Sequence, residues 1–217
     1  PFVDANGQTN GKTNGEVYKV KPGNSKYVDI NKDGVYNDAD QGIIGCGQPT
    51  FNWGWNNTFN YKNFDFSFFV VGFHGFDIYN ATHQMGYNLI KSQQVAGVTP
   101  MRELLNRWTP TNTNTNIPGF VNGGTENKDF FSTRFVENGS FIKMKSITLG
   151  YTLPETACRA LGITNLRVYA SVQNPFHITN YSGLDPEATM GSPLVQGVDW
   201  GSYPNSRNYL IGLNFSF

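Results

Sequence analysis

Residues 51–61 read FNWGWNNTFNY, and the alternation in this stretch decides the fold class. Every second residue from Phe51 to Tyr61 is aromatic, interrupted only by Asn57, whereas the residues between them are Asn, Gly or Thr. Side chains of a β-strand point alternately to the two faces of its sheet. A period of two therefore indicates a strand with one aromatic face and one small, polar face.

Four further stretches repeat this period-two alternation. In the last one, apolar residues from Tyr209 to Phe217 alternate mainly with Asn, Gly and Ser. The second stretch becomes apolar on both faces in its second half, which contains FFVV at 68–71. We therefore predict five strands, at 51–61, 64–73, 141–151, 166–174 and 208–217.

The stretch 141–151 departs from the alternation near its start. Ile147, Leu149 and Tyr151 alternate with small polar residues, but Lys143 and Lys145 share the register of the apolar side chains. Either the lysines lie beyond an apolar band, or a β-bulge inserts an extra residue and shifts the phase.

The length of the predicted strands bears on where the sheet lies. They run about ten residues, close to the 9–11 of a tilted transmembrane strand and longer than the five or six usual in globular sheets. Their polar faces carry Asn, Thr, Ser and Gly rather than Lys and Glu, as suits a crowded polar barrel interior. A soluble antiparallel sandwich, whose strands also alternate, is the competing interpretation.

The connections between the predicted strands alternate between short and long. KN at 62–63 and TLPETACRALGITN at 152–165 are short, whereas residues 74–140 and 175–207 form long connections. Outer-membrane barrels combine short periplasmic turns with long extracellular loops. We therefore predict an all-β fold: strands and long extracellular loops of a large antiparallel transmembrane β-barrel, with 51–61, 141–151 and the last strand running toward the periplasm.

Five strands cannot close a plugged barrel, and single-chain bacterial barrels have even strand numbers. We therefore expect residues 1–217 to be the C-terminal part of one β-barrel domain, with the N-terminal strands outside this chain.

Charge and composition exclude several classes of protein. The chain has 16 Lys and Arg against 16 Asp and Glu, and no basic stripe interleaves with its aromatics, which argues against nucleic acid as a partner. The longest apolar run, FFVVGF at 68–73, is far shorter than the ~20 residues of a membrane helix. The three histidines are scattered without a nucleophile motif, so we do not expect an enzyme.

Residues 29–40 read DINKDGVYNDAD and have the spacing of an EF-type calcium loop. Gly34 at the sixth position permits the sharp turn, and no helix is expected on either side. A closing Asp in place of the bidentate Glu of an EF-hand predicts weaker binding and a structural role. An Asx-rich turn without metal is the alternative. The predicted Ca²⁺ ligands are Asp29, Asn31, Asp33, the carbonyl of Val35, and Asp40.

A set of motifs in fixed order gives the chain a family resemblance. They are YVDINKDGVYNDADQGIIG, GFHGFDIYN, NRWTPTNTNTNIP, RFVENGSFIKMKSITLGYTLP, LRVYASVQNPFHITNYSGLDPE and YPNSRNYLIGLNFSF. From about residue 16 onward, the chain resembles the C-terminal segment of SusC-type TonB-dependent transporters of Bacteroides-like bacteria. GCGQPT, in which Cys46 replaces an expected polar residue, departs from the family pattern.

This resemblance implies a role in nutrient import across the outer membrane of a Gram-negative, Bacteroidetes-like cell. Family members carry oligosaccharides or peptides, work with a SusD-like surface lipoprotein as a lid, and draw energy from TonB through a plug that is not in this chain. The chain would then contribute barrel wall, in contact with outer-membrane lipid, and extracellular loops to a plugged barrel of about 22 strands. The alternative is a secreted, calcium-stapled β-sandwich that binds carbohydrate through Trp53, Trp55 and Trp108.

Overall fold

The computed structural model describes residues 22, 23, 25, 27–33, 38–87, 101–119, 132–160, 162–190 and 195–217. The chain divides into two compact units. The sheet unit comprises residues 45–80 and 136–217, and the loop unit comprises residues 1–44 and 81–135. Across the described residues, no helix is both long enough and apolar enough to cross a membrane.

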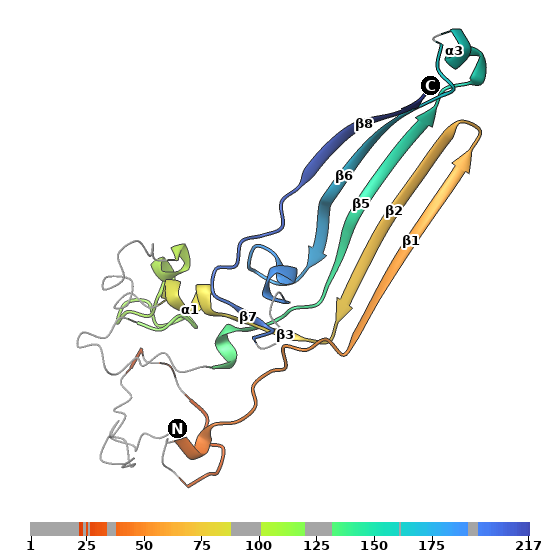
Figure 1. The fold of residues 1–217 in the computed structure, drawn as a ribbon. Coiled ribbons are helices and arrows are strands. Elements are labelled where there is room, and N and C mark those ends of the chain that lie inside the picture. Colours follow the sequence, from red (N-terminus) through yellow and green to blue (C-terminus); the bar gives the residue numbers. More distant parts are fainter. Residues whose placement is uncertain are drawn as a thin grey trace. The chain divides into compact units, whose positions relative to one another are not determined.

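The sheet unit contains an antiparallel sheet of five long strands (Figure 1). All five strands predicted from the sequence are present, and most of their ends agree within one residue. The fourth strand continues five residues beyond its predicted end. In spatial order the strands are β1 (Phe51–Tyr61), β2 (Phe64–His74), β5 (Phe141–Thr152), β6 (Asn165–Thr179) and β8 (Asn208–Ser216).

The register of the sheet aligns the apolar residues of all five strands on one face. One row across the sheet consists of Phe59, Phe66, Leu149, Ala170 and Ile211. Because successive side chains of a strand alternate in direction, the neighbouring row lies on the opposite face. That row consists of Thr58, Ser67, Thr148, Ser171 and Leu210.

A β-bulge in β5 explains the two lysines that the sequence left ambiguous. The pairing of β5 with β2 passes from Met144 to Ser146 with no residue of β2 skipped, so Lys145 is the extra residue. A one-residue insertion moves every following side chain to the other face. Lys143 consequently pairs with Val71 on the polar face, while Ile147 stays on the apolar face. Of the two explanations, the bulge is therefore confirmed.

The short and long connections lie at opposite ends of the strands, as predicted (Figure 1). Lys62 and Asn63 join β1 to β2, with Lys62 in a left-handed conformation (φ 53°). The connection from β5 to β6 contains the short helix α3 (Glu155–Ala160). Residues 75–140 and 180–207 connect the strands at the other end, and the second of these contains η4 (Pro186–Met190).

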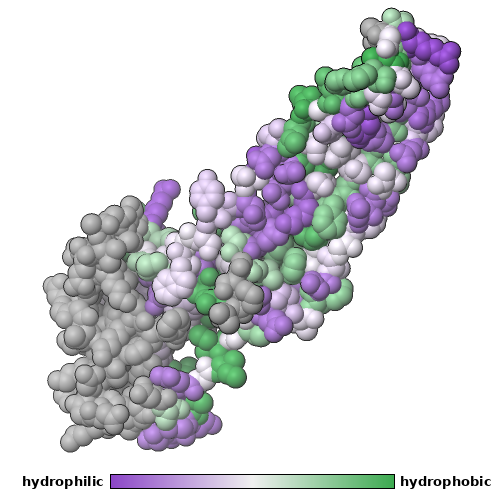
Figure 2. Space-filling view, viewed as in Figure 1, coloured by the Kyte–Doolittle hydropathy of each residue, from purple (hydrophilic) through white to green (hydrophobic). Residues whose placement is uncertain are grey.

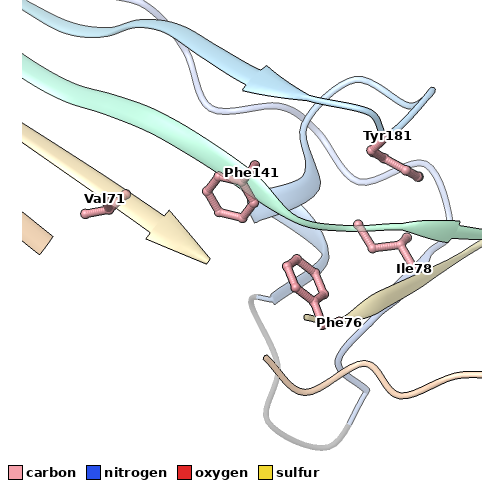
Figure 3. Close-up of a cluster of buried hydrophobic side chains, with 5 residues drawn as sticks. All are labelled: Val71, Phe76, Ile78, Phe141 and Tyr181. Carbon is pink, nitrogen blue, oxygen red and sulfur yellow. The ribbon is translucent and has the colours of Figure 1, made fainter. Parts of the chain in front are cut away.

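A small second sheet and an apolar cluster lie at the end of the sheet unit with the long connections. β3 (Asp77–Asn80) pairs antiparallel with β4 (Val136–Asn138) and parallel with β7 (Val198–Asp199). These strands are too short to show a period in the sequence. Beside them pack the buried side chains shown in Figure 3: Val71, Phe76, Ile78, Phe141 and Tyr181.

Where the structure describes the loop unit, its regular elements are short helices. They are η1 (Asp38–Asp40), α1 (Ala81–Tyr87), η2 (Arg102–Asn106) and η3 (Thr133–Phe135). Edge-to-face contacts join His83, Tyr87 and Phe135. The Tyr87 hydroxyl donates a hydrogen bond to Glu103, and burial together with this bond raises the pKa of Tyr87 to about 12. These contacts connect α1 to η2 and η3.

Candidate functional site: a membrane-facing sheet and the loops at its end

The apolar face of the five-stranded sheet is open. Exposed fractions are 53% for Trp55, 53% for Phe59, 51% for Leu149 and 85% for Ile211. Figure 2 shows hydrophobic residues (green) at the surface of this unit, interleaved with hydrophilic ones (purple). An apolar surface that extends over five strands is far larger than the patches of ordinary soluble domains. Its alternation with a polar face is that of strands in contact with lipid.

The sandwich alternative required a second sheet packed on this apolar face. In the described part of the sheet unit, the second sheet is formed by three strands of two to four residues. The three tryptophans of that alternative belong to two different units. The Trp53 ring lies over Gly72 and Trp55 packs edge-on against Phe68 within the apolar face, whereas Trp108 packs against Gly23 in the loop unit. The sandwich interpretation is therefore wrong.

The opposite face of the sheet is polar and internally paired. The Arg167 guanidinium donates to both carboxylate oxygens of Asp65, at 2.8 and 2.5 Å. The bond passes over Gly150, where a Cβ atom would lie 2.5 Å from Arg167 Nη2. Arg167 also lies 5.0 Å from the centroid of the Tyr169 ring, which in turn covers Gly212. Two glycines thus make room for the large polar side chains of this face.

A cluster of four charges joins β5 to the connection between β6 and β8. Lys143 Nζ lies 2.7 Å from Asp185 Oδ2 and 2.7 Å from Glu187 Oε2, and Lys145 also pairs with Glu187. Asn205 donates to Asp185 from its backbone and side-chain nitrogens, both at 3.1 Å. Asp185 is therefore both buried and fully paired.

The ionisation of Asp185 reflects two opposing effects. Burial raises the pKa of its carboxyl group, whereas the hydrogen bonds from Lys143 and from the backbone of Asn205 lower it. The bonds prevail, and the pKa of Asp185 lies below its ordinary value. The carboxylate is consequently charged at neutral pH, and the cluster is an ion-pair network.

Other carboxylates satisfy the backbone of the same loops. Asp199 accepts the Tyr181 hydroxyl at 2.6 Å and the backbone N–H groups of Gly201 and Ser202, both at 2.9 Å. Glu137 accepts hydrogen bonds from the backbone and hydroxyl of Ser182, each at 2.8 Å. Each of these carboxylates accepts hydrogen bonds from backbone N–H groups that the short strands do not pair. No sequence pattern had singled out Asp199.

The structure describes four of the five predicted calcium ligands, and Val35 lies outside the described residues. Asp40 Oδ1 accepts the backbone N–H of Ile30 at 2.9 Å, which brings the last predicted ligand back to the first part of the loop. Asp33 and Asn31 are hydrogen-bonded to each other at 2.9 and 3.0 Å. Oxygen donors of this kind fit Ca²⁺.

Acidic, histidine and cysteine side chains alone do not complete such a site. Among the described residues, no group of three or more of them is placed to hold a metal ion. The predicted loop also uses an amide and a carbonyl oxygen as ligands, so calcium binding stays a prediction.

Comparison with known proteins gives long matches to one class. The chain is 35% identical over 202 residues to TonB-dependent receptor P3 of Formosa agariphila, a match that covers 90% of this chain and 19% of that protein. It is 30% identical over 198 residues to TonB-dependent receptor SusC of Bacteroides thetaiotaomicron, covering 91% and 18%. No family profile matches the chain.

Solved structures of a transporter complex share the fold. The RagAB peptide importer in its closed-closed state matches with a TM-score of 0.69 and 26% identity, over 88% of this chain and 21% of that one. The RagAB peptide transporter matches with a TM-score of 0.65 and 26% identity, over 79% and 17%. The chain thus spans about a fifth of the length of the proteins that it matches.

The strands, the open apolar face and these matches define a segment of a transmembrane β-barrel of the TonB-dependent receptor class. Within that class, the chain is homologous to the SusC type, as its motifs predicted. The homology also supports the outer-membrane location that the sequence predicted.

Proposed function

We propose that the protein to which this chain belongs imports nutrients across the outer membrane, driven by TonB and covered by a SusD-like surface lipoprotein. The main support is homology to TonB-dependent receptors over nine tenths of the chain. The open apolar face agrees with it, because a barrel wall needs such a face toward lipid. The cargo is an oligosaccharide or a peptide, and the role is transport rather than catalysis.

Within that transporter, the chain contributes part of the barrel wall and the loops at one end of it. The five strands present lipid-facing apolar residues and lumen-facing polar residues. The long connections, which carry the ion-pair cluster, lie at the extracellular end. The plug and the segment that contacts TonB belong to other parts of the protein.

Cell fractionation tests the location, and gene deletion tests the import. We expect the parent chain in an outer-membrane fraction that requires detergent, several times larger than 24.2 kDa, with gel mobility that changes on boiling. A deletion strain should grow normally on simple sugars and amino acids but poorly on one class of oligosaccharide or peptide. A water-soluble chain near 24.2 kDa, or a deletion that affects growth on none of these cargoes, would contradict the proposal.

We further propose that Ca²⁺ binds at Asp29, Asn31, Asp33, Val35 and Asp40 and stiffens this part of the loop unit. Isothermal titration of the full-length protein in detergent should show one Ca²⁺ site that Asp33→Asn and Asp40→Asn weaken. The matched control is Asp77→Asn, a carboxylate of the sheet unit that accepts the N–H of Cys46. Equal Ca²⁺ binding by the wild type and the Asp33→Asn variant would rule out this site.

A further inference from the structure

The connection between β6 and β8, residues 180–207, is fastened to β5 by buried charges. The side chains of Lys143 and Asp185 are each only 3% exposed, and Glu187 is 18% exposed. Surface ion pairs contribute little, but removing one member of a buried pair leaves an uncompensated charge and is strongly unfavourable. Because the pair is buried, breaking it is costly, and the pair therefore holds the connection against β5.

The bulge at Lys145 is what places these charges. Without the extra residue, Lys143 would lie on the apolar face of the sheet, since side chains alternate along β5. With it, Lys143 lies on the polar face and reaches Asp185, while Lys145 reaches Glu187. β6 carries a matching irregularity at residues 174–175, with Asn174 in a left-handed conformation (φ 49°). Both strands are thus deformed where the cluster forms.

Carboxylates hold both ends of the connection, and those of the cluster hold the second end. Near its end, Asn205 donates to Asp185 at 3.1 Å and to Glu187 at 2.9 Å. Near its beginning, Tyr181 donates to Asp199, and the backbone of Ser182 donates to Glu137. Asn205, near the end of the connection, is thus bonded to two carboxylates from its first half, Asp185 and Glu187.

We propose that Lys143, Asp185 and Glu187 form an electrostatic latch that fixes the connection between β6 and β8 at the end of β5. The latch sets the position of Trp200 and Tyr203, which are 58% and 88% exposed. The latch is thus a positioning device for this face of the loop.

The charge balance of the latch provides its test. Two lysines face two carboxylates, so the cluster is neutral. Replacing Lys143 or Asp185 alone by a neutral residue leaves one net buried charge, whereas replacing both restores neutrality. An electrostatic latch consequently requires that the double variant be less disturbed than either single variant.

Hydrogen exchange followed by mass spectrometry on the full-length protein in detergent measures the loop directly. The reporters are the amides of Gly201, Ser202 and Asn205, which donate to Asp199 and Asp185. Lys143→Met and Asp185→Asn should each accelerate their exchange by roughly a hundredfold, and the double variant should lie nearer the wild type. Exchange in the barrel strands should stay unchanged.

Arg159→Met is the matched control, because Arg159 pairs with Glu155 at the other end of the sheet with both side chains over 80% exposed. It should leave the loop amides unaffected. Wild-type exchange in the single variants, or additive effects in the double variant, would overturn the latch. If Lys143→Met does not assemble, Lys145→Met and Glu187→Gln provide the same non-additivity test on the more exposed pair.

Discussion

Gly150 shows at the scale of one residue how the polar face of the sheet is built. Asp65 and Arg167 approach each other across this position from the neighbouring strands, and only a residue without a Cβ atom leaves room for them. Their carboxylate and guanidinium form a bidentate pair, the stronger kind of ion pair. The glycine is thus required by the neighbours it accommodates.

Replacing Gly150 by Ala should destabilise the barrel by about 1–3 kcal/mol, because the methyl group overpacks the site and separates the pair. The measurement is the temperature at which the folded gel band converts to the unfolded one. Gly54→Ala is the control on the same face, since its Cβ would lie 3.2 Å from the mobile end of the Phe69 ring. An equal shift for both variants would show that Gly150 has no special role.

The lowered pKa of Asp185 predicts how the loop responds to acid. A carboxyl whose pKa is lower in the folded state contributes its full stabilisation above its unfolded pKa of about 3.9. That stabilisation is lost as the pH falls from there through the folded pKa. Lys143 and Glu187 face it from β5 and η4. Protection of the Asn205 amide, corrected for intrinsic exchange, should stay constant from pH 7 to about 5 and fall below about 4. Loss of protection near pH 6 would contradict this assignment.

At the scale of an element, β5 offers two adjacent residues on opposite faces. Leu149 lies in the apolar row with Phe66 and Ala170, and Thr148 lies in the polar row, where its hydroxyl bonds that of Ser171 at 2.8 Å. Leu149→Arg should destabilise the membrane-embedded barrel by about 2–4 kcal/mol, whereas Thr148→Arg should cost much less. The folded fraction in urea titrations with lipid vesicles measures the difference. A larger loss from Thr148→Arg would reverse the assigned faces.

The bulge of β5 makes a second prediction at this scale. Deleting Lys145 removes the extra residue, so that either Lys143 or Ile147 must turn to the wrong face. We expect the deletion to prevent assembly, seen as loss of the heat-modifiable band. Lys145→Ala keeps the residue count and should assemble. Normal assembly of the deletion variant would mean that the bulge is dispensable.

At the scale of the whole molecule, the two cysteines report the orientation of the strands. Cys46 is exposed and its backbone pairs with β3 at the end with the long connections, whereas Cys158 is buried in α3 at the end with the short turns. A membrane-impermeant maleimide added to intact cells should label Cys46 and not Cys158. Cys46→Ser should abolish the labelling and Cys158→Ser should not. Labelling that persists in Cys46→Ser would contradict the orientation.

Much of the architecture was accessible from the sequence because one physical signal dominates it. Each strand contacts lipid on one face and polar side chains on the other. Apolar and polar residues therefore alternate with a period of two in FNWGWNNTFNY and in the four other stretches. The end with the long connections was less accessible. There β3, β4 and β7 have two to four residues, too few for any period, and they form through partners distant in the chain.

The sequence by itself determined the five strands, their apolar and polar faces, the alternation of connections and the family. These features follow from local alternation and from motifs that each lie within one short segment. Only the tertiary structure decided that Lys145 is the bulged residue, that Gly150 makes room for Asp65 and Arg167, and that Asp185 is buried against Lys143. The reason is that each of these depends on a contact between two strands or loops. The sequence of one segment does not say which residue of another segment it contacts.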